Sequence, residues 1–254
     1  MEPLKLLEQL IPVARNAGAL IMDIYASDFE VHGKEDASPV TAADQRAEVL
    51  ILESLARLTP DIPVIAEEAV AAGEIPDVKD RFWLVDPLDG TREFVNRNGE
   101  FTVNIALIEN HQPVLGVVYA PAIGRLFAGA INQTAFQEDS SGKRDIHVRQ
   151  PPEAGLTVVA SRSHSDPEKL QAFLKGQHIA EVRNAGSSLK LCLVAAGEAD
   201  LYPRLGRTME WDIAAGHAVL AAAGGRLTDT DMQPMQYGKS DFANPHFIAW
   251  GFSQ

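Results

Sequence analysis

An apolar strand that runs directly into two carboxylates is the feature that most limits how this chain can fold. Residues 83–91 read WLVDPLDGT, so a run predicted to be a buried strand is followed at once by Asp86 and Asp89. Like charges a few ångström apart destabilise a fold or raise a pKa unless something neutralises them. A divalent cation removes that penalty, and Mg²⁺ prefers carboxylate and carbonyl oxygens. Gly90 permits close approach of a ligand, and Thr91 adds a hydroxyl.

Taken alone, this motif is better explained as an Asp-Gly turn that caps a helix. Further acids in similar positions change the balance. Glu67 and Glu68 follow the predicted strand 64–66, Asp44 lies on the first turn of a predicted helix, and Asp212 directly precedes another. The helix dipole alone would favour Asp44, and an N-cap role would suit Asp212. The sequence therefore predicts a cluster of carboxylates drawn from several elements.

The rest of the chain predicts a helical start, an antiparallel centre and a mixed second half. Apolar spacing predicts a long helix near 4–24, with a kink or split at Pro12 or Gly18, and a second after the turn 38–41. The predicted strands are 64–66, 82–85, 101–107, 114–119, 126–128, 157–160, 200–202 and 247–250, and the later helices are 167–174, 187–196 and 212–223. A composition shift near 150 predicts two halves, 1–150 and 151–254, in one compact catalytic unit.

The charge of the chain excludes several classes of partner. The 254 residues include 35 acidic and 22 basic side chains, a formal net charge of −13. This disfavours nucleic-acid polymers and anionic membranes, but not a small phosphorylated ligand whose charge metal ions neutralise. Cys192, the only cysteine, lies in an apolar run and is expected to be a small buried hydrophobe. With no signal peptide and no apolar stretch near the ~20 residues of a membrane span, we expect a cytoplasmic protein without a transmembrane segment.

Four motifs, in order along the chain, resemble the inositol monophosphatase superfamily of Mg²⁺-dependent, lithium-sensitive phosphatases. The motifs are 38–44 (SPVTAAD), 66–68 (AEE), 83–91 (WLVDPLDGT), and 211–216 (WDIAAG) with 223–225 (AGG). Segments 97–108, 160–164, 186–190 and 201–204 are similar to its bacterial branch of 3′(2′),5′-bisphosphate nucleotidases. The resemblance covers essentially the whole chain. It implies a layered α-β-α-β-α sandwich that joins an α+β half to an α/β half.

The resemblance also implies roles for the acids. The implied magnesium ligands are Glu67, Asp86 and the backbone carbonyl of Leu88 for one ion, and Asp86, Asp89 and Asp212 for a second. Thr91, hydrogen-bonded towards Asp44, would orient the metal-bound water that attacks phosphorus, so Asp44, Glu67 and Thr91 are the expected catalytic residues. Glu68 is expected either to support these ligands or to hold a third, weaker Mg²⁺.

Substrate specificity is expected from the second half. A bisphosphorylated nucleotide carries a second phosphate away from the metals, and a cation should meet it. Ser187 and Ser188 precede a predicted helix and form an anion site, Lys190 lies on its first turn, and Arg204 follows a short strand. For Lys190 a solvated helix face is an equal alternative. Ser161 begins a polar loop, 161–164, that either contacts the base or ribose or simply joins a strand to a helix. The metal-side residues expected to contact substrate as well are Glu67, Leu88, Asp89, Gly90, Thr91 and Asp212.

These features favour one reaction over two alternatives. We expect Mg²⁺-dependent hydrolysis of the 3′-phosphate of adenosine 3′,5′-bisphosphate to AMP and phosphate by in-line attack of water, which the resemblance links to sulfur assimilation. The alternatives are an inositol monophosphatase or fructose-1,6-bisphosphatase-like enzyme, and a non-catalytic nucleotide or metal sensor. A sensor should have lost at least one of the acids, and none is missing. The resemblance allows a homodimer and peripheral attachment to the inner membrane.

Overall fold

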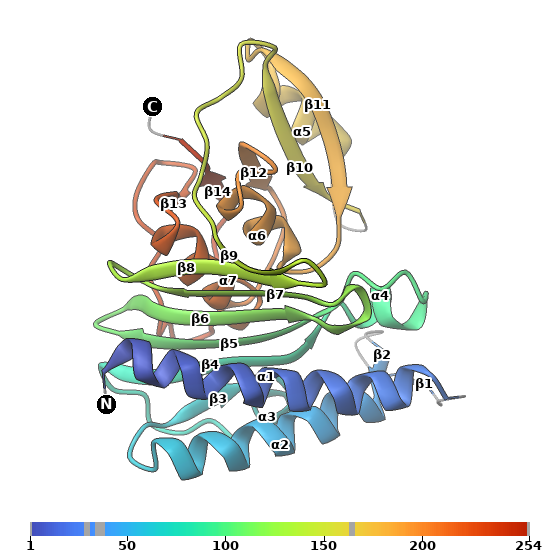
Figure 1. Ribbon diagram of the computed structural model, residues 1–254, viewed down its shortest axis with the longest axis vertical. Coiled ribbons are helices and arrows are strands. Elements are labelled where there is room, and N and C mark those ends of the chain that lie inside the picture. Colours follow the sequence, from blue (N-terminus) through green and yellow to red (C-terminus); the bar gives the residue numbers. More distant parts are fainter. Residues whose placement is uncertain (1, 28–30, 34–38, 163–165, 253–254) are drawn as a thin grey trace.

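Two sheets of unequal size organise the protein, shown as a computed structural model in Figure 1. The structure describes residues 2–27, 31–33, 39–162 and 166–252. In spatial order the strands of the larger sheet are β3 (Val64–Ala66), β4 (Arg81–Asp89), β5 (Thr102–Glu109), β6 (Gln112–Ala120), β7 (Arg125–Ala130), β8 (Thr134–Asp139) and β9 (Gly142–Asp145). β3 is parallel to β4, and all later neighbours pair antiparallel. The predicted antiparallel centre is therefore confirmed.

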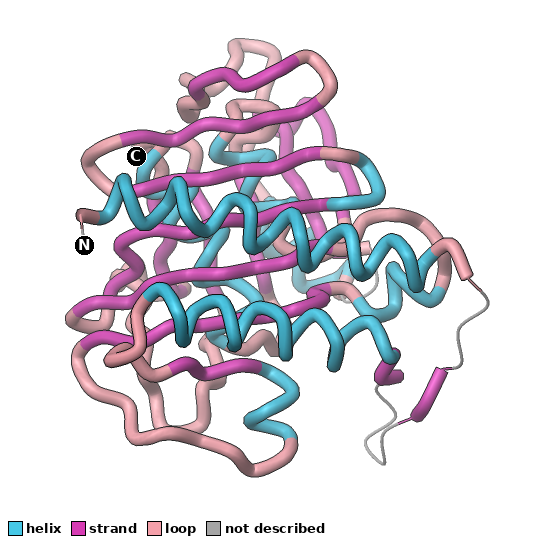
Figure 2. The backbone as a smooth tube through the Cα atoms, turned by 60° about the horizontal axis from the view of Figure 1, so that its bottom comes forward, coloured by secondary structure: helices cyan, strands magenta, loops and turns pink. Residues whose placement is uncertain are grey.

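Two long helices cover the outer face of this sheet. α1 (Pro3–Tyr25) and α2 (Ala42–Leu58) lie side by side across the strands in Figure 2. Their apolar residues form one core cluster with alternate residues of β4, such as Trp83 and Val85, while Phe82 and Leu84 face the opposite side. A strand buried on both faces explains the unbroken apolar run 82–85. α1 continues as one helix through Pro12, so the predicted split does not occur.

The smaller sheet contains only residues of the second half. Its spatial order is β11 (Ile179–Ala185), β10 (Leu156–Ser161), β12 (Leu201–Arg204), β14 (Phe247–Trp250) and β13 (Arg226–Asp229). α6 (Leu189–Ala195) and α7 (Glu210–Ala222) share a core cluster with both sheets and so form the middle layer. α5 (Pro167–Leu174) contributes Phe173 and Leu174 to a cluster on the outer face. The layers thus follow the expected order α-β-α-β-α.

Short elements complete the chain. They are β1 (Val31–Gly33), β2 (Pro39–Thr41), α3 (Glu67–Ala71), α4 (Thr91–Val95) and the 3₁₀ helix η1 (Pro121–Ile123). The larger sheet ends at Asp145 and the smaller begins at Leu156, and the division into two halves at 150 stays a prediction. Among the described residues, no helix combines the length and apolar character needed to cross a bilayer.

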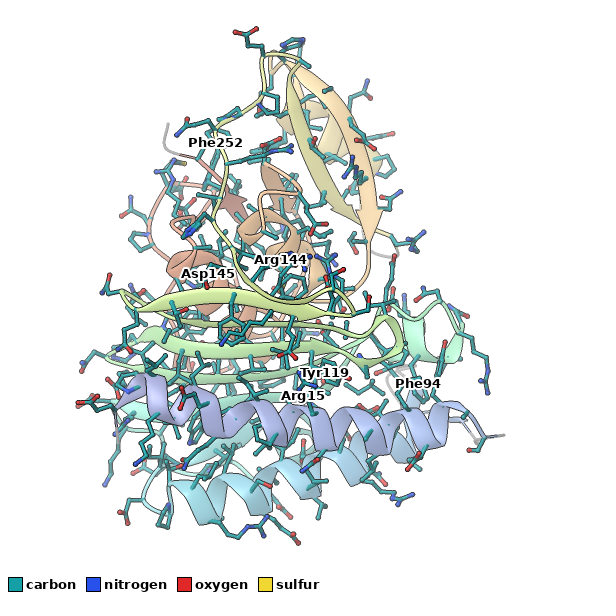
Figure 3. The ribbon with its side chains drawn as sticks, in the orientation of Figure 1. Arg15, Phe94, Tyr119, Arg144, Asp145 and Phe252 are labelled. Atoms are coloured by element: carbon teal, nitrogen blue, oxygen red, sulfur yellow. The ribbon has the colours of Figure 1, made fainter. Side chains whose placement is uncertain are left out.

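Six strands were not predicted: β1, β2, β8, β9, β11 and β13. β2 lies where the sequence predicted a turn into the second helix, so that prediction is wrong. β9 forms an edge of the larger sheet, and its residues, including Arg144 and Asp145, are exposed (Figure 3). β11 is an edge strand of the smaller sheet and is exposed over most of its length. Exposed strands need no apolar alternation, so the pattern used to find strands is absent there.

A close approach between α7 and the larger sheet fixes the position of that helix. A Cβ at Gly116 on β6 would lie 2.6 Å from the backbone oxygen of Ala215 on α7. That distance is shorter than any van der Waals contact, so only glycine allows the helix backbone to lie against the strand here. The start of α7, which carries Asp212, is therefore held at a fixed height above the sheet.

Cys192 and His217 are two buried side chains of the middle layer, and Cys192 matches its prediction. Cys192 on α6 is buried, and burial raises the pKa of its thiol, as expected of an inert small hydrophobe. His217 on α7 is buried, and its Nδ1 lies 2.8 Å from the hydroxyl of Tyr237. It is thus a packed histidine rather than a metal ligand.

His217 predicts a loss of stability in acid. Burial lowers its pKa from 6.5 to about 4. The unfolded chain takes up a proton near pH 6.5, whereas the folded chain does so only near pH 4. The free energy of unfolding should therefore fall by about 3 kcal/mol, from this group, as the pH drops through that window. Denaturant titrations between pH 7 and pH 4 should show this part of the loss removed in His217→Gln and retained in the exposed control His246→Gln.

Candidate active site

A cavity of about 810 Å³ lies where the ends of β4 and β12 meet the starts of α4, α6 and α7. Its lining brings together residues predicted separately along the chain. The predicted site residues that line it are Glu67, Asp89, Gly90, Thr91, Ser161, Ser187, Ser188, Lys190, Arg204 and Asp212. Of the other three, Asp86 and Leu88 lie on β4 beneath this surface, and Asp44 lies on the first turn of α2.

A bulge in β4 gives the two central acids their places. β4 pairs with β5 in one register up to Asp86 opposite Asn104, and resumes with Asp89 opposite Thr102. β4 therefore carries one extra residue, which re-aims its side chains. The backbone N–H of Leu88 donates to Asp86 Oδ1 at 3.0 Å. The acids were expected to follow the strand, but they lie within it because pairing resumes beyond the bulge.

Asp86 is the most deeply buried of these acids. It is 1% exposed, and burial raises its pKa well above the usual value. The charges of four other carboxylates raise it further: Glu67, Asp89, Asp212 and Asp44. The five acids singled out from the sequence therefore lie close enough to act on one another.

Asp212 approaches this cluster from the opposite layer. α7 begins at Glu210, so Asp212 is its third residue, and the N-cap position belongs to Met209. The alternative of an N-cap role for Asp212 is therefore wrong, because the N-cap lies three residues earlier. Its Oδ2 accepts a hydrogen bond from the backbone N–H of Met209 at 2.8 Å. Burial, then the charges of Asp89 and Glu67, raise its pKa well above the usual value.

Asp89 has a more mixed environment. Burial raises its pKa, and the positive charge of Lys190 and a hydrogen bond from Asn104 oppose that rise. Lys190 is itself 3% exposed, and its Nζ donates to the carbonyls of Ala185 at 3.1 Å and Ser187 at 2.6 Å. Burial lowers the pKa of Lys190 to about 8. The alternative of a solvated helix face is therefore wrong, and Lys190 is a buried cation beside the acids.

Thr91 begins α4, directly after Gly90, whose φ of 91° is a left-handed conformation that suits glycine. The Thr91 hydroxyl donates to the carbonyl of Leu88 at 3.5 Å. This places the hydroxyl beside one of the expected metal ligands. Its expected hydrogen bond towards Asp44 stays a prediction.

The loop before α6 is held in place by the first half of the chain. Ser187 has a φ of 38°, and its hydroxyl donates to the carbonyl of Glu100 at 2.9 Å. The carboxylate of Glu100 accepts from the backbone N–H of Gly186 at 2.8 Å and from the guanidinium of Arg162 at 3.0 Å. Ser188 follows, and its hydroxyl donates to the carbonyl of Asp212.

The two remaining predicted substrate residues lie at strand ends. Arg204 is the last residue of β12 rather than the residue after it, and it is 9% exposed. Its Nη2 donates to the carbonyl of Arg207 at 3.0 Å, while its Nε has no hydrogen-bond partner among the described residues. Ser161 ends β10 and lines the cavity, whereas Ser163 and His164 of the same predicted loop lie outside the described residues.

The cavity also contains residues that the sequence did not single out. They include Arg92, Glu93, Tyr202, Arg207 and Trp211. Arg92 and Glu93 directly follow Thr91, and Trp211 directly precedes Asp212, so adjacency to a motif was the available signal. Arg207 lies in the loop between β12 and α7, and only the fold brings it to the cavity.

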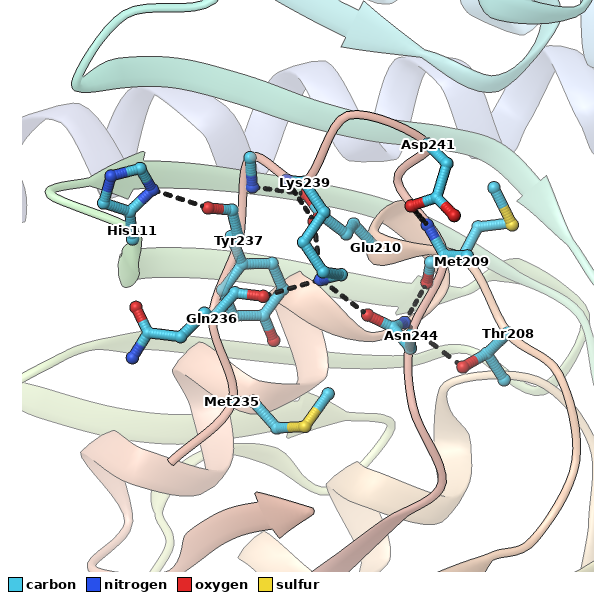
Figure 4. A network of polar contacts seen from close by, with 12 residues as sticks. His111, Thr208, Met209, Glu210, Met235, Gln236, Tyr237, Lys239, Asp241 and Asn244 are labelled. Atoms are coloured by element: carbon cyan, nitrogen blue, oxygen red, sulfur yellow. Dashed lines mark hydrogen bonds and ion pairs between the residues drawn. The ribbon is translucent and has the colours of Figure 1, made fainter. Parts of the chain in front are cut away.

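A polar network holds the residues that directly precede Asp212 in place (Figure 4). The carboxylate of Glu210, which is fully buried, accepts from the backbone N–H groups of Gly238 at 2.7 Å and Lys239 at 2.9 Å, and pairs with Lys239 Nζ at 2.6 Å. Asn244 donates to the carbonyl of Met209 at 2.6 Å. Residues just before Asp212 are thereby tied to the segment 238–244.

The donor chemistry of the carboxylate cluster suits a hard divalent cation. Its carboxylates repel one another in a buried place, which is the penalty that Mg²⁺ would remove. Within the part of the chain that the structure describes, no three acidic, histidine or cysteine side chains are already closed into a metal-holding geometry. The acids are therefore neighbours in electrostatic contact, which a cation would have to draw together.

Comparisons with known proteins agree with this arrangement. Residues 2–250 match the inositol monophosphatase family. Two curated 3′(2′),5′-bisphosphate nucleotidases named CysQ are similar over 95% of this chain and 98% of their own: that of Escherichia coli O157:H7 at 49% identity and that of Salmonella typhimurium strain LT2 at 50%. The crystal structure of CysQ from Bacteroides thetaiotaomicron, described as a bacterial member of the inositol monophosphatase family, superposes with a TM-score of 0.82 at 37% identity and covers 97% of each chain.

Proposed function

The chain belongs to the inositol monophosphatase family, and from that membership we propose that it is a 3′(2′),5′-bisphosphate nucleotidase that removes the 3′-phosphate of adenosine 3′,5′-bisphosphate. The observation that carries the proposal is an identity of about half, over nearly the full length, to curated nucleotidases of that name. The cavity supports it, because its lining combines the acids Glu67, Asp89 and Asp212 with the cations Lys190 and Arg204. A phosphate ester with two anionic ends requires both.

Magnesium is the cofactor that the acids would hold. The expected ligands are Glu67, Asp86 and the Leu88 carbonyl for one ion, and Asp86, Asp89 and Asp212 for a second. Burial and mutual repulsion of these carboxylates support this assignment. When bound, the ions supply neutralisation of phosphoryl charge and a lower pKa for an attacking water.

The chain's own residues orient that attack. The Thr91 hydroxyl lies 3.5 Å from the Leu88 carbonyl, and when it donates its one hydrogen towards Asp44 its oxygen can accept a hydrogen bond from a water. Asp44, buried on α2 and within electrostatic reach of Asp86, takes up one proton of the water as the water oxygen bonds to phosphorus. The P–O3′ bond in line with it breaks, and the 3′-oxygen leaves as the ribose hydroxyl after gaining a proton from solvent. The bulge in β4 sets the relative positions of Thr91, Leu88 and Asp89.

Recognition of the rest of the substrate falls to the second half. The backbone N–H groups of Ser187 and Ser188 before α6, with Lys190 and Arg204, provide donors and positive charge for the second phosphate. Ser161 at the end of β10 lines the cavity, which supports a contact between its hydroxyl and the ribose or base. We further propose a cytoplasmic role in clearing this nucleotide during sulfur assimilation.

A substrate panel tests the assignment. Phosphate release from adenosine 3′,5′-bisphosphate, inositol 1-phosphate and fructose 1,6-bisphosphate should be measured side by side while Mg²⁺ is titrated. We expect the highest kcat/KM on the nucleotide, with no turnover in EDTA. A higher kcat/KM on inositol 1-phosphate would overturn the nucleotide assignment, and binding of nucleotide without turnover would favour a sensor.

A further inference from the structure

One buried amide that no proposed catalytic step uses links a carboxylate of one layer to the backbone of another. Asn104 lies on β5, is fully buried, and does not line the cavity. Its Nδ2 donates to Asp89 Oδ2 at 3.3 Å and to Ser188 Oγ at 3.1 Å. Ser188 Oγ in turn donates to the backbone carbonyl of Asp212. A continuous chain of hydrogen bonds therefore runs from the carboxylate on β4 to the start of α7.

The orientation of this amide is dictated by its neighbours. Both hydrogens of Nδ2 are engaged, and Asn104 Oδ1 has no partner among the described residues. Turning the amide over would place Oδ1 against the carboxylate of Asp89, which accepts hydrogen bonds and donates none when ionised. A buried acceptor left without a donor is unfavourable for stability. Fold stability alone therefore does not explain an amide at this position.

We propose that Asn104 is a positioning residue for the metal site: it fixes one oxygen of Asp89 and, through Ser188, the distance from Asp89 to Asp212. The inference rests on the proposed function. With Oδ2 held by the amide of Asn104, the orientation of the Asp89 carboxylate towards the cation is restricted. Groups that orient a ligand in this way raise metal affinity by restricting the ligand's motion.

The side chain of Asn104 is neutral, which matters for the charge of the site. A lysine or arginine in its place would hold Asp89 equally well but would cancel the negative charge that attracts Mg²⁺. Lys190 already contributes one positive charge near Asp89. Asn104 restrains the carboxylate without adding a second.

Asn104→Leu tests the proposal, because leucine has a similar volume and neither donates nor accepts. Thr102→Val is the matched control. Thr102 lies two residues away on the same strand and face, is fully buried, and its hydroxyl has no partner among the described residues. Mg²⁺ binding should be measured by calorimetry without substrate, together with melting temperatures in EDTA and kinetics at saturating Mg²⁺.

We expect Asn104→Leu to weaken Mg²⁺ binding by about 10- to 100-fold, the range found for groups that orient metal ligands. Its melting temperature in EDTA should match or exceed that of the unmodified protein, and kcat should fall more than KM rises. Thr102→Val should bind Mg²⁺ normally. Unchanged Mg²⁺ affinity in Asn104→Leu, or an equal loss in Thr102→Val, would overturn the proposal.

A second variant breaks the same series of hydrogen bonds at another residue. Ser188→Ala removes the link to Asp212 without altering β5, so it also reports if Asn104→Leu fails to fold. Ser188→Ala should likewise weaken Mg²⁺ binding in the absence of substrate. Normal Mg²⁺ binding would contradict the proposal that these hydrogen bonds position the metal ligands. An unmodified protein that binds Mg²⁺ but leaves the bisphosphate intact would overturn the proposed function alone.

Discussion

Replacement of Asp89 by asparagine is expected to lower Mg²⁺-dependent phosphate release by more than about a hundredfold, the upper end of the loss caused by altering a group that only orients a ligand. Asparagine keeps the shape of the side chain and can still accept the hydrogen bond from Asn104. It removes one negative charge beside Asp86 and Asp212, so the affinity for the cation should fall with the activity. Phosphate release from the bisphosphate at saturating Mg²⁺ is the measurement.

The same change should stabilise the protein in the absence of metal. The charge of Asp89 raises the pKa of both Asp86 and Asp212, which shows that the three carboxylates repel one another in the folded state. Removing one charge relieves that repulsion only in the folded chain. The melting temperature in EDTA should therefore rise, while the further increase produced by Mg²⁺ should shrink.

Opposite changes in activity and metal-free stability distinguish a metal ligand from a structural acid. Asp23→Asn, which removes an exposed carboxylate on α1, should change neither quantity. Full Mg²⁺-dependent activity in Asp89→Asn would contradict the assignment of Asp89 as a ligand. A lower melting temperature in EDTA would contradict the repulsion argument.

The acids of the site could be predicted because each is marked by its local context. Asp86, Asp89 and Glu67 follow or interrupt strands whose apolar runs are visible in the sequence, and β3 and β4 are neighbours in the sheet. The bulge between Asp86 and Asp89 could not be predicted, because a register shift is defined by the partner strand. The role of Asn104 could not be predicted either, because its sequence context is that of any polar residue in an alternating strand.

Side chains placed by long-range packing were harder to interpret. Lys190 follows Ser188 on a short helix, a pattern equally typical of a solvated face, and only the packing of α6 between two sheets buries it. Arg207 has no motif of its own and reaches the cavity through the loop between β12 and α7. The acids could thus be found from local sequence, whereas the positions of most residues expected to set substrate specificity depend on tertiary contacts.

Replacement of Arg204 is expected to have a large effect on substrate specificity. Arg204→Gln should lower kcat/KM for adenosine 3′,5′-bisphosphate by about 10- to 100-fold, because a hydrogen bond to a charged group contributes about 1.5–3 kcal/mol. The effect on adenosine 3′-monophosphate, which lacks the 5′-phosphate, should be much smaller. Arg204 lines the cavity and its Nη2 donates to the carbonyl of Arg207, which leaves further N–H groups of the guanidinium for a ligand.

Comparing the two substrates separates recognition from an indirect effect on the metal site. The charge of Arg204 also lowers the pKa of Asp212, so its loss would disturb the acids for both substrates alike. Only the part of the loss confined to the bisphosphate reports contact with the second phosphate. Arg226→Gln is a suitable control, because Arg226 also has buried nitrogens without partners among the described residues but lies over Trp250, and it does not line the cavity.

Arg207→Gln decides between the two arginines at this end of the cavity. Arg207 is exposed there, and its backbone carbonyl accepts the hydrogen bond from Arg204, so the two side chains occupy adjacent positions. If Arg204 contacts the second phosphate, Arg207→Gln should leave the ratio of the two kcat/KM values near that of the unmodified protein. A ratio that collapses in Arg207→Gln and survives in Arg204→Gln would move phosphate recognition to the exposed loop. Arg204 would then serve to hold that loop through the carbonyl of Arg207.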